Sequence, residues 1–451
     1  MHITRLDLQS YRRFEQFSIE LDPKLTVIVA RNGQGKTTVL EAVVAALGPF
    51  VGAFDEGRGH HLQQSDVHRK TTSEQWPANE PQYPVIVSAE LARDGDSNIE
   101  WSRRLNSGKK GSKTTVKEAA PLVSWGKTLQ NDVREGIPID LPVVAYYSSN
   151  RLWLSNMNRR SRSSAILTKS RTAAYEDALA TSVASFFQLE EWMKTTYLAS
   201  MQESVRADRT NRFAGWLVGV SNCVDYVMAE EGWADFKFNF ALDELSMDHP
   251  DHGVLPVSML SDGVRAIISL VGDLALRCVR LNPHLGVDAP NRTKGIVLID
   301  EVDLHLHPSW QQRVVRTLRN AFPEVQFILT THSPQVISTV SSNQTRIVQR
   351  DHDGRWQAFP PDEQVKGLES SVALSDVMGV SPVPDIPESK MIRDYSYLVE
   401  SGKKESGEGL ALRKQLEGLY GPTHRVLIEA DRLDRFQVLK TGLRKRQRNN
   451  G

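Results

Sequence analysis

A glycine-rich loop between a buried strand and a helix is the feature that most constrains what this chain can fold into. Residues 24–30 form a nearly continuous apolar run rich in β-branched residues, which predicts a strand buried on both faces. The loop A-R-N-G-Q-G-K-T-T follows at residues 30–38, and apolar residues then recur at helical spacing from Lys36 to Leu47. A buried strand, a tight loop and a helix in this order predict an α/β fold.

The loop matches the P-loop pattern G-x-x-x-x-G-K-[ST], except that Ala30 stands at the first glycine. Because alanine is the smallest possible change, we expect the loop to tolerate it. Backbone N–H groups of a P-loop surround phosphates, and the helix N-terminus adds a favourable dipole. A chance Gly-Lys-Thr turn is the alternative. The residues assigned to ATP are Asn32, Gly33, Gly35, Lys36 (β- and γ-phosphates), Thr37 (which also holds Mg²⁺) and Thr38 (α-phosphate).

A second motif, G-I-V-L-I-D-E at residues 295–301, is an apolar strand that ends in two acids. It has the form of a Walker B motif, in which we expect Asp300 to bind Mg²⁺ through water. We expect Glu301 to orient and activate the attacking water, because phosphoryl transfer depends mainly on positioning and electrostatics. The alternative is a buried strand capped by two surface acids, and the P-loop argues against it.

A third motif, L-S-D-G at residues 260–263, precedes an amphipathic helix and resembles the LSGG signature of ABC ATPases. The resemblance implies that Ser261, Gly263 and the helix N-terminus face the γ-phosphate of ATP bound to a second subunit. The helix dipole attracts anions, and serine is a good helix cap. Asp262 departs from the pattern, because a carboxylate near phosphate is unfavourable unless it points away or caps the helix. An ordinary N-cap is the alternative.

The sequence T-T-H-S-P at residues 330–334 directly follows a predicted strand. ABC ATPases carry a switch histidine here, so His332 is assigned a catalytic role. A neutral imidazole can hydrogen-bond the γ-phosphate and sense its loss. Asp303 occupies the D-loop position, where the resemblance implies a contact with the partner subunit. His305 and His307 are interpreted as structural residues rather than as a metal pair.

Together these motifs resemble the SMC/RecF/OLD-like group of ABC ATPases over residues 1–50 and 255–340. The resemblance implies an α/β fold of the ABC type, a P-loop ATPase head with a mixed sheet and helices, interrupted by a mainly helical insertion. It also implies ATP and Mg²⁺ as ligands and a homodimer or higher homo-oligomer held together through ATP.

Two weaker assignments come from the same resemblance. Arg12 or Arg13 matches an N-terminal arginine that contacts nucleotide, and a surface arginine is the alternative. We assign Arg12. Gln64 or Asp66 is a candidate for the Q-loop ligand of Mg²⁺. We assign Gln64.

Residues 141–153 and 369–380 look like the PtuA-like ATPases of Septu and retron anti-phage systems. That resemblance implies an HNH nuclease partner of the PtuB type. The chain would then sense and regulate, and the partner would cut nucleic acid.

The order of motifs predicts four parts. Residues 1–150 would form the N-terminal half of the head, with Walker A, and residues 151–250 the helical insertion. Residues 251–350 would form the C-terminal half, with signature, Walker B and switch histidine, and residues 351–451 a helical extension. Within the insertion, helices are expected at residues 173–206 and 210–231.

Composition adds little about partners, because 55 basic and 55 acidic residues give a formal charge of zero. Two clusters could contact DNA, retron nucleic acid or a protein, and the alternative is a solvated loop. The clusters are Arg151, Arg159, Arg160, Arg162, Lys169 and Arg171, and Lys109, Lys110 and Lys113. Two cysteines, no long apolar run and a charged N-terminus predict a cytoplasmic protein with no membrane partner.

Three other functions are considered. A RecF-like repair ATPase would bind DNA without a nuclease partner. A transporter ATPase subunit is disfavoured by the long insertion between Walker A and signature. An OLD-like nuclease would need a Toprim domain, for which too few residues follow the acids near 426–436. We therefore interpret Glu429, Asp431 and Asp434 as solvated helix positions.

Overall fold

The computed structural model describes residues 1–71, 79–93, 95, 97–109, 112–149, 170–180, 186–204 and 211–436. The chain divides into two compact units, Met1–Gly379 and Val380–Gly451. None of the helices in the described ranges combines the length and the apolar character that a membrane span requires.

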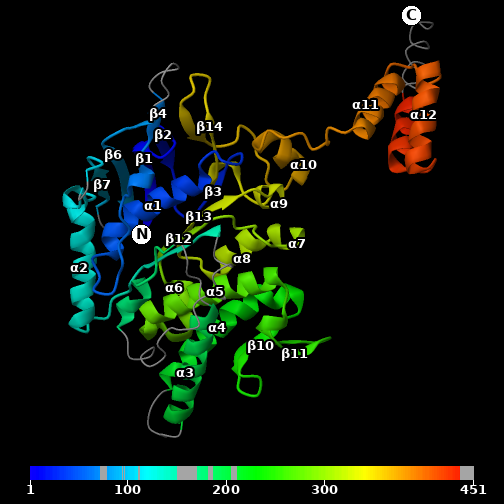
Figure 1. The fold of residues 1–451 in the computed structure, drawn as a ribbon. Coiled ribbons are helices and arrows are strands. Elements are labelled where there is room, and N and C mark those ends of the chain that lie inside the picture. The colour runs from blue at the N-terminus through cyan, green and yellow to red at the C-terminus, as the bar shows by residue number, and fades with distance from the viewer. Residues whose placement is uncertain are drawn as a thin grey trace, which may run out of the picture. The chain divides into compact units, whose positions relative to one another are not determined.

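A buried six-stranded sheet forms the centre of the first unit, with strand order β15-β14-β3-β13-β12-β8. Neighbouring strands are parallel except for the antiparallel β14–β15 pair. Every residue of β3, β8, β12 and β13 is buried, which their continuous apolar runs explain. The strands are β3 (Leu25–Val29), β8 (Val143–Tyr147), β12 (Gly295–Ile299), β13 (Val325–Thr331), β14 (Thr345–Arg350) and β15 (Trp356–Phe359) (Figure 1).

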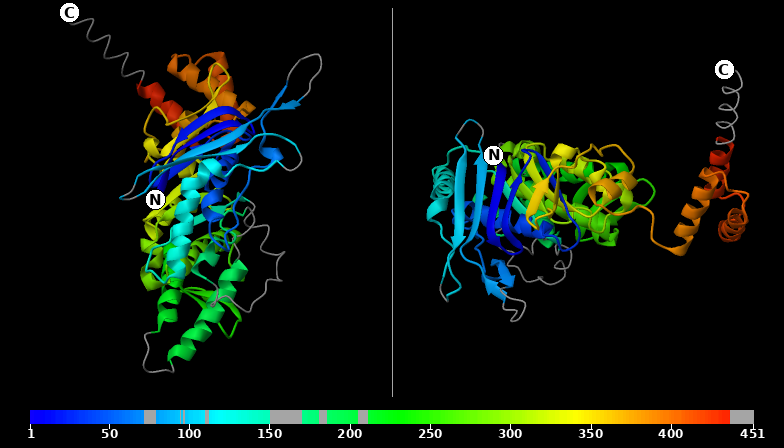
Figure 2. Two further views of the ribbon diagram at one scale, coloured as in Figure 1. Left: turned by 90° about the vertical axis from the view of Figure 1, so that its left-hand side faces the viewer. Right: turned by 90° about the horizontal axis from the view of Figure 1, so that it is seen from above.

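A second, antiparallel sheet has the order β2-β1-β6-β7. Helix α1 (Lys36–Val51) contacts both β13 of the central sheet and β6 of this sheet, so it joins the two layers. Figure 2 shows the four strands side by side, with α2 (Ala120–Arg134) against β7. The strands are β1 (His2–Tyr11), β2 (Phe14–Glu20), β6 (Val85–Ala92) and β7 (Ile99–Leu105), and a separate small pair is β4 (Arg69–Thr71) with β5 (Asn79–Pro81).

Helix α5 (Asp262–Leu281) follows the L-S-D-G motif, as its amphipathic pattern predicted, and it contacts β8. A buried ion pair on this helix joins Arg277 to Asp273, with an N–O distance of 2.7 Å. The α-helices that follow α5 in the first unit are α6 (Ala289–Arg292), α7 (Pro308–Gln311), α8 (Val314–Ala321), α9 (Pro334–Ile337) and α10 (Ser370–Val372).

The region expected to be mainly helical contains both helices and strands. Its helices α3 (Phe186–Ser204) and α4 (Arg212–Met228) accompany a three-stranded sheet of order β11-β10-β9. The helix predicted over 173–206 is wrong at its start, because Tyr175 is buried and its hydroxyl donates to the carbonyl of Pro142 at 2.6 Å. The strands are β9 (Ala234–Asn239), β10 (Glu244–His249) and β11 (Gly253–Pro256).

Residues 351–379, which we expected in the C-terminal extension, belong to the first unit. Strand β15 pairs with β14 in full register from Ile347 opposite Phe359 to Arg350 opposite Trp356. The backbone hydrogen bonds of this hairpin therefore hold the segment on the central sheet. The four-part division of the chain stays a prediction.

The second unit is a small helical module with its own core of Tyr395, Val399, Leu416, Leu427 and Ala430. Its helices are α11 (Pro387–Glu400), α12 (Gly407–Tyr420) and residues 425–436.

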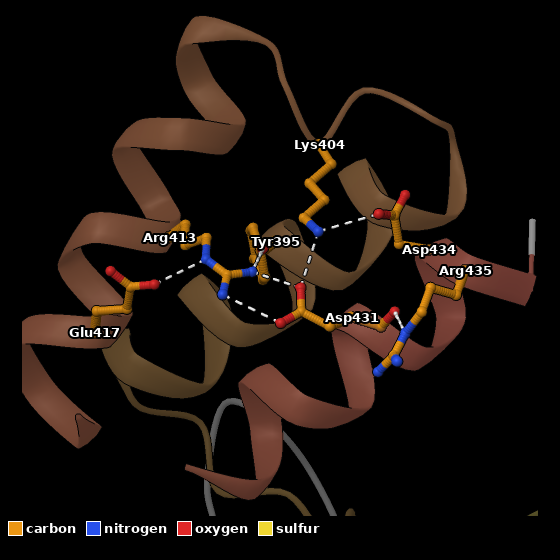
Figure 3. Close-up of polar contacts among 7 residues, drawn as sticks. All are labelled: Tyr395, Lys404, Arg413, Glu417, Asp431, Asp434 and Arg435. Carbon is orange, nitrogen blue, oxygen red and sulfur yellow. Dashed lines mark hydrogen bonds and ion pairs between the residues drawn. The ribbon is translucent and has the colours of Figure 1, made fainter. Parts of the chain in front are cut away.

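A charged network ties these helices together, as Figure 3 shows. Asp431 accepts hydrogen bonds from both terminal nitrogens of Arg413, at 2.6 and 3.1 Å, and from Lys404 at 2.8 Å. Lys404 also donates to Asp434 at 3.0 Å. Asp431 and Asp434, interpreted as solvated helix positions, are partly exposed on a helix and also take part in this network. Glu429 also fits the interpretation as a solvated helix position, because its side chain is exposed. Among the ion pairs found in the described residues, Glu429 pairs only with Arg425.

This network predicts the pH dependence of the second unit. Hydrogen bonds from Arg413, with Lys404 adding to them, lower the pKa of Asp431 to about 2, below the unfolded value of about 3.9. The stabilisation is thus complete above about pH 4 and is lost as the pH falls toward 2. We expect Asp431→Asn to destabilise the unit by roughly 1 kcal/mol at pH 7, because partly exposed ion pairs contribute about this much.

Hydrogen–deuterium exchange of α11 and α12 peptides in the full chain measures this effect. Asp431→Asn should speed exchange relative to wild type at pH 7, and the difference should shrink between pH 4 and pH 2. Glu429→Gln on the same helix is the matched control and should leave exchange unchanged. Equal effects of the two substitutions would contradict the account.

Candidate nucleotide site

The glycine-rich loop has the backbone geometry that phosphate binding needs. Gly33 and Gly35 have φ angles of 72° and 102°, in the region where other residues are strained. Gly35 is the N-cap of α1, whose first turn has no side-chain cap and no acid. The N–H groups of that turn therefore have no capping side chain and are available to an anion. Ala30 at the first glycine position does not prevent this geometry.

Lys36 is buried, and its ammonium group donates to the carbonyl of Ala30 at 2.9 Å. Burial lowers the pKa of Lys36, while the carboxylates of Asp300, Glu301 and Asp303 oppose that shift. The loop lysine therefore lies within electrostatic reach of both Walker B acids, as the motifs predicted. A positive charge among three carboxylates is the arrangement expected where a phosphate and a divalent cation bind together.

Asp300 is the centre of the site. Its side chain is buried and accepts a hydrogen bond from the hydroxyl of Thr37 at 2.9 Å and another from the hydroxyl of Thr330 at 2.5 Å. Its backbone N–H donates to the carbonyl of Tyr147 at 2.8 Å. The two residues proposed to hold Mg²⁺ are thus in direct contact. A hydroxyl and a carboxylate are hard oxygen ligands of the kind Mg²⁺ prefers, so the donor set fits this ion.

Glu301 lies at the end of β12 with a φ angle of 50°, which is uncommon for a residue with a side chain. Its backbone N–H donates to the Thr330 hydroxyl at 2.8 Å, so one hydroxyl positions both Walker B acids. A strained backbone held by its surroundings is frequent at functional sites.

His332 is held beside the same site by Asp303. The carboxylate of Asp303 accepts from the Thr331 hydroxyl at 2.6 Å and from the backbone N–H of His332 at 3.3 Å. Burial, followed by the charge of Lys36, lowers the pKa of His332, so its ring is neutral at pH 7. A neutral ring suits the predicted γ-phosphate contact. Asp303 makes these contacts within its own chain, and its expected contact with a partner subunit stays a prediction.

The signature residues stand at the start of helix α5. Ser261 is exposed at the N-terminus of α5, and its hydroxyl makes no cap hydrogen bond, contrary to the expected serine cap. Asp262 turns toward Arg265, with an N–O distance of 2.6 Å, and so can leave the helix end to an anion. A Cβ on Gly263 would lie 2.5 Å from the carbonyl oxygen of His305, so only glycine allows this packing.

Two assigned residues make other contacts. Arg12 forms ion pairs with Asp66, at 2.9 Å, and with Glu41 of α1. Gln64 accepts from the hydroxyl of Tyr83 and donates to the carbonyl of Ser107 at 3.4 Å. In the described part of the chain no hydrogen bond joins Gln64 to Thr37 or Asp300. The assignments of Arg12 and Gln64 stay predictions. Arg13 lies closer to the loop, because a Cβ on Gly35 would be 2.7 Å from its Cδ.

Sequence reasoning missed three contributors to the site. Thr330 was seen only as a neighbour of His332, although a threonine pair directly after a buried strand was a usable signal. Tyr147 links the site to the signature helix, because its hydroxyl donates to Asp273 of α5 at 2.8 Å. Arg277 completes that link by donating to the same carboxylate at 2.7 Å and to the carbonyl of Ala174 at 2.9 Å.

Residues 151–169 and Lys110, which carry most of the predicted basic clusters, lie outside the described residues. Arg171 is described, and it is committed to the fold: its guanidinium donates to the carbonyls of Leu281 and Ile139, each at 2.7 Å. His305 and His307 belong to no group of three or more metal-ligating side chains in the described ranges.

Comparison with known proteins agrees with this geometry. A family model described as "AAA domain" matches residues 5–202, and one described as "AAA domain, putative AbiEii toxin, Type IV TA system" matches residues 229–338. "Retron Vc95 probable ATPase" of Vibrio cholerae serotype O1 biovar El Tor is 42% identical over 158 residues, 34% of this chain and 30% of that protein. In motifs and relatives the chain resembles the head of an ABC-type ATPase.

Two further relatives of this ABC-type head support the resemblance to PtuA. "Retron Ec83 probable ATPase" of Escherichia coli is 37% identical over 201 residues, 44% of this chain and 35% of that protein. "Septu protein PtuA" of Bacillus mycoides (strain KBAB4) is 51% identical over 75 residues, 17% of this chain and 10% of that protein. The chain therefore spans about a third or less of the length of these relatives.

The Thr330 contacts give a prediction. Thr330→Val keeps the side-chain shape but removes the hydroxyl that positions Asp300 and Glu301. We expect kcat for ATP hydrolysis to fall about 10- to 100-fold, as for other residues that orient metal ligands, while the Kd for ATP without Mg²⁺ changes little. A coupled ATPase assay and titration calorimetry measure the two quantities. Thr317→Val, a buried threonine on α8, is the control, and equal losses in both variants would refute the role of Thr330.

Proposed function

We propose that the chain binds and hydrolyses ATP with Mg²⁺ as an ABC-type ATPase. The observation that carries the proposal is the contact of the Asp300 carboxylate with Thr37 of the loop and Thr330 of β13. The loop lysine Lys36, the acids Asp300 and Glu301 and the neutral His332 belong to the same site. The family-model matches and the retron ATPases support the same function.

The residues divide the chemistry among them. The amides of Asn32, Gly33, Gly35 and Lys36, together with the Lys36 ammonium, would hold the β- and γ-phosphates, and Thr38 the α-phosphate. Bound Mg²⁺, held by Thr37 and Asp300, would supply positive charge that stabilises the leaving phosphate oxygens. Glu301 would orient the attacking water and accept its proton, and His332 would donate a hydrogen bond to the γ-phosphate.

A second copy of the chain would complete each site. The N-terminus of α5 carries an exposed Ser261 hydroxyl without a cap bond and has Asp262 drawn aside by Arg265. In the described residues no hydrogen bond joins Ser261 to the loop of its own chain. A two-fold dimer that sets the Ser261 helix end of each molecule on the other's γ-phosphate would use both unsatisfied helix ends, because the interface repeats by symmetry.

The relatives support a proposal for the biological role. Proteins named as retron ATPases and as Septu PtuA match the head, which favours an ATPase of a bacterial anti-phage system. We propose that this ATPase regulates a separate HNH nuclease of the PtuB type in the cytoplasm, and that it contacts DNA or retron nucleic acid. Co-purification with the proteins encoded beside it tests the nuclease partner, and recovery of no HNH protein would contradict that part.

Replacing Glu301 separates binding from hydrolysis. Glu301→Gln keeps the side-chain size but removes the proton acceptor, so kcat should fall about 100- to 1,000-fold. ATP should still bind, and ATP-bound dimers should accumulate in light scattering after size exclusion. Glu363→Gln, an exposed glutamate, should behave as wild type. Rapid turnover by Glu301→Gln would remove the role given to Glu301.

Replacing Lys36 tests the loop itself. Lys36→Ala removes a buried charge that would bond the phosphates, and such bonds contribute about 1.5–3 kcal/mol each. We therefore expect the Kd for ATP to rise at least about 10- to 100-fold. Titration calorimetry measures it, with Lys127→Ala, an exposed lysine on α2, as the control. Unchanged ATP affinity would contradict the P-loop assignment.

A further inference from the structure

A hollow of about 810 Å³ lies on the outer face of the antiparallel sheet, beside the turn of the β14–β15 hairpin. Its floor is polar, because alternate residues of β1, β2 and β6 point away from the core. Cross-strand register places Gln9 opposite Gln16, and Asp7 opposite both Ser18 and Ser88. Amide and hydroxyl side chains thus form rows across the strands.

One wall of the hollow is a tryptophan that two arginines contact. Arg350 and Trp356 are opposite each other in the hairpin register. The guanidinium carbons of Arg350 and Arg13 lie 5.0 and 5.2 Å from the centre of the Trp356 ring. The exposed side chain of Arg355 lines the same hollow. Three arginines from two distant segments therefore converge here.

These arginines lack acidic partners. Among the described residues, no carboxylate pairs with the guanidinium group of Arg13, Arg350 or Arg355, and Asp351 accepts from Arg355 only the backbone N–H, at 2.8 Å. Burial, and then the charge of Arg350, lowers the pKa of Arg13, as expected for two cations near one another. An arginine pair without a counter-ion is a favourable place for a bound anion, and phosphate matches the guanidinium fork well.

The acids that line the hollow do not supply that counter-charge. Asp7 is paired with Arg5 at 3.0 Å, and Glu15 with Lys70 at 3.2 Å. Asp353 in the hairpin turn is the third acid of the lining. The lining itself holds three arginines and three acids, and only the pairing of Asp7 with Arg5 and of Glu15 with Lys70 leaves an excess of positive charge at the hollow.

The hollow also touches the nucleotide loop. A Cβ atom added to Gly35 would lie only 2.7 Å from the Cδ atom of Arg13. The aliphatic part of the Arg13 side chain therefore packs directly on the loop glycine. A ligand that moves Arg13 would therefore press on the loop that carries Lys36.

We propose that this hollow binds a short stretch of single-stranded nucleic acid. Arg350 and Arg355 would hold successive phosphates, and a base would stack on the exposed part of the Trp356–arginine layer. Gln9 and Gln16 would hydrogen-bond the base edges, which a single strand presents freely and a duplex does not. The inference deepens the nucleic-acid part of the proposed function, but the binding itself requires no ATP.

Fluorescence anisotropy of a labelled oligothymidylate, measured in the absence of ATP, tests this proposal. Its length of about 12 nucleotides is within the usual range of single-strand site sizes. The full-length double variant Arg350→Ala/Arg355→Ala should bind at least about 10-fold more weakly than wild type. The slope of log Kd against log salt should fall by about 1.4, because each lost phosphate contact contributes about 0.7. Arg292→Ala/Arg319→Ala removes two exposed arginines elsewhere and should leave binding unchanged.

The proposal would be contradicted if the wild-type chain did not bind the oligonucleotide, or if the Arg350/Arg355 variant bound it as tightly as wild type. Equal weakening in both double variants, or equally tight binding of a duplex of the same length, would also contradict it. All four replaced residues are exposed, and unchanged melting temperatures would exclude a folding defect. Because the assay contains no ATP, its failure would not contradict the proposal that the chain hydrolyses ATP. Conversely, unexpected results with the Lys36 and Glu301 variants would not contradict binding of nucleic acid at this hollow.

Discussion

The buried carboxylate of Asp300 is the contact on which the candidate site depends. A buried charge is costly unless it is hydrogen-bonded and compensated, and Asp300 has the hydroxyls of Thr37 and Thr330 and the nearby charge of Lys36. These partners come from two elements, the start of α1 and the end of β13, which meet at the carboxyl ends of parallel strands. The central sheet thus determines the geometry of the site before any ligand binds.

The same residue is the start of a continuous set of contacts toward the signature helix. The backbone N–H of Asp300 donates to Tyr147, and the Tyr147 hydroxyl donates to Asp273 in the buried pair with Arg277. Helix α5 is therefore fixed to the strand next to Walker B, and its exposed N-terminus carries Ser261. These contacts hold the signature helix at a defined position, with Ser261 exposed at its start.

The sequence predicted what depends on local pattern and failed where distant segments meet. The loop, α1, β12 and β13 follow from periodicity and glycine placement, and so the P-loop and Walker B residues could be assigned correctly as neighbours. The joint role of Thr330, the inward packing of Tyr175 and the Arg13–Trp356 contact could not be predicted, because each depends on tertiary packing between remote residues. The ion pairs of Asp431 were not predicted for the same reason, since its partners Arg413 and Lys404 lie on other segments.

Complementation between two inactive variants tests most directly whether one molecule completes the site of another. Lys36→Ala has a defective loop and an intact signature, and Ser261→Arg has the reverse, at an exposed position that tolerates the change in the folded chain. In a shared two-fold dimer, each mixed dimer contains one intact site. An equimolar mixture should then regain about a quarter of the wild-type ATPase rate, whereas each variant alone is inactive. A mixture as inactive as its components, or full activity of Ser261→Arg alone, would contradict a site built from two molecules.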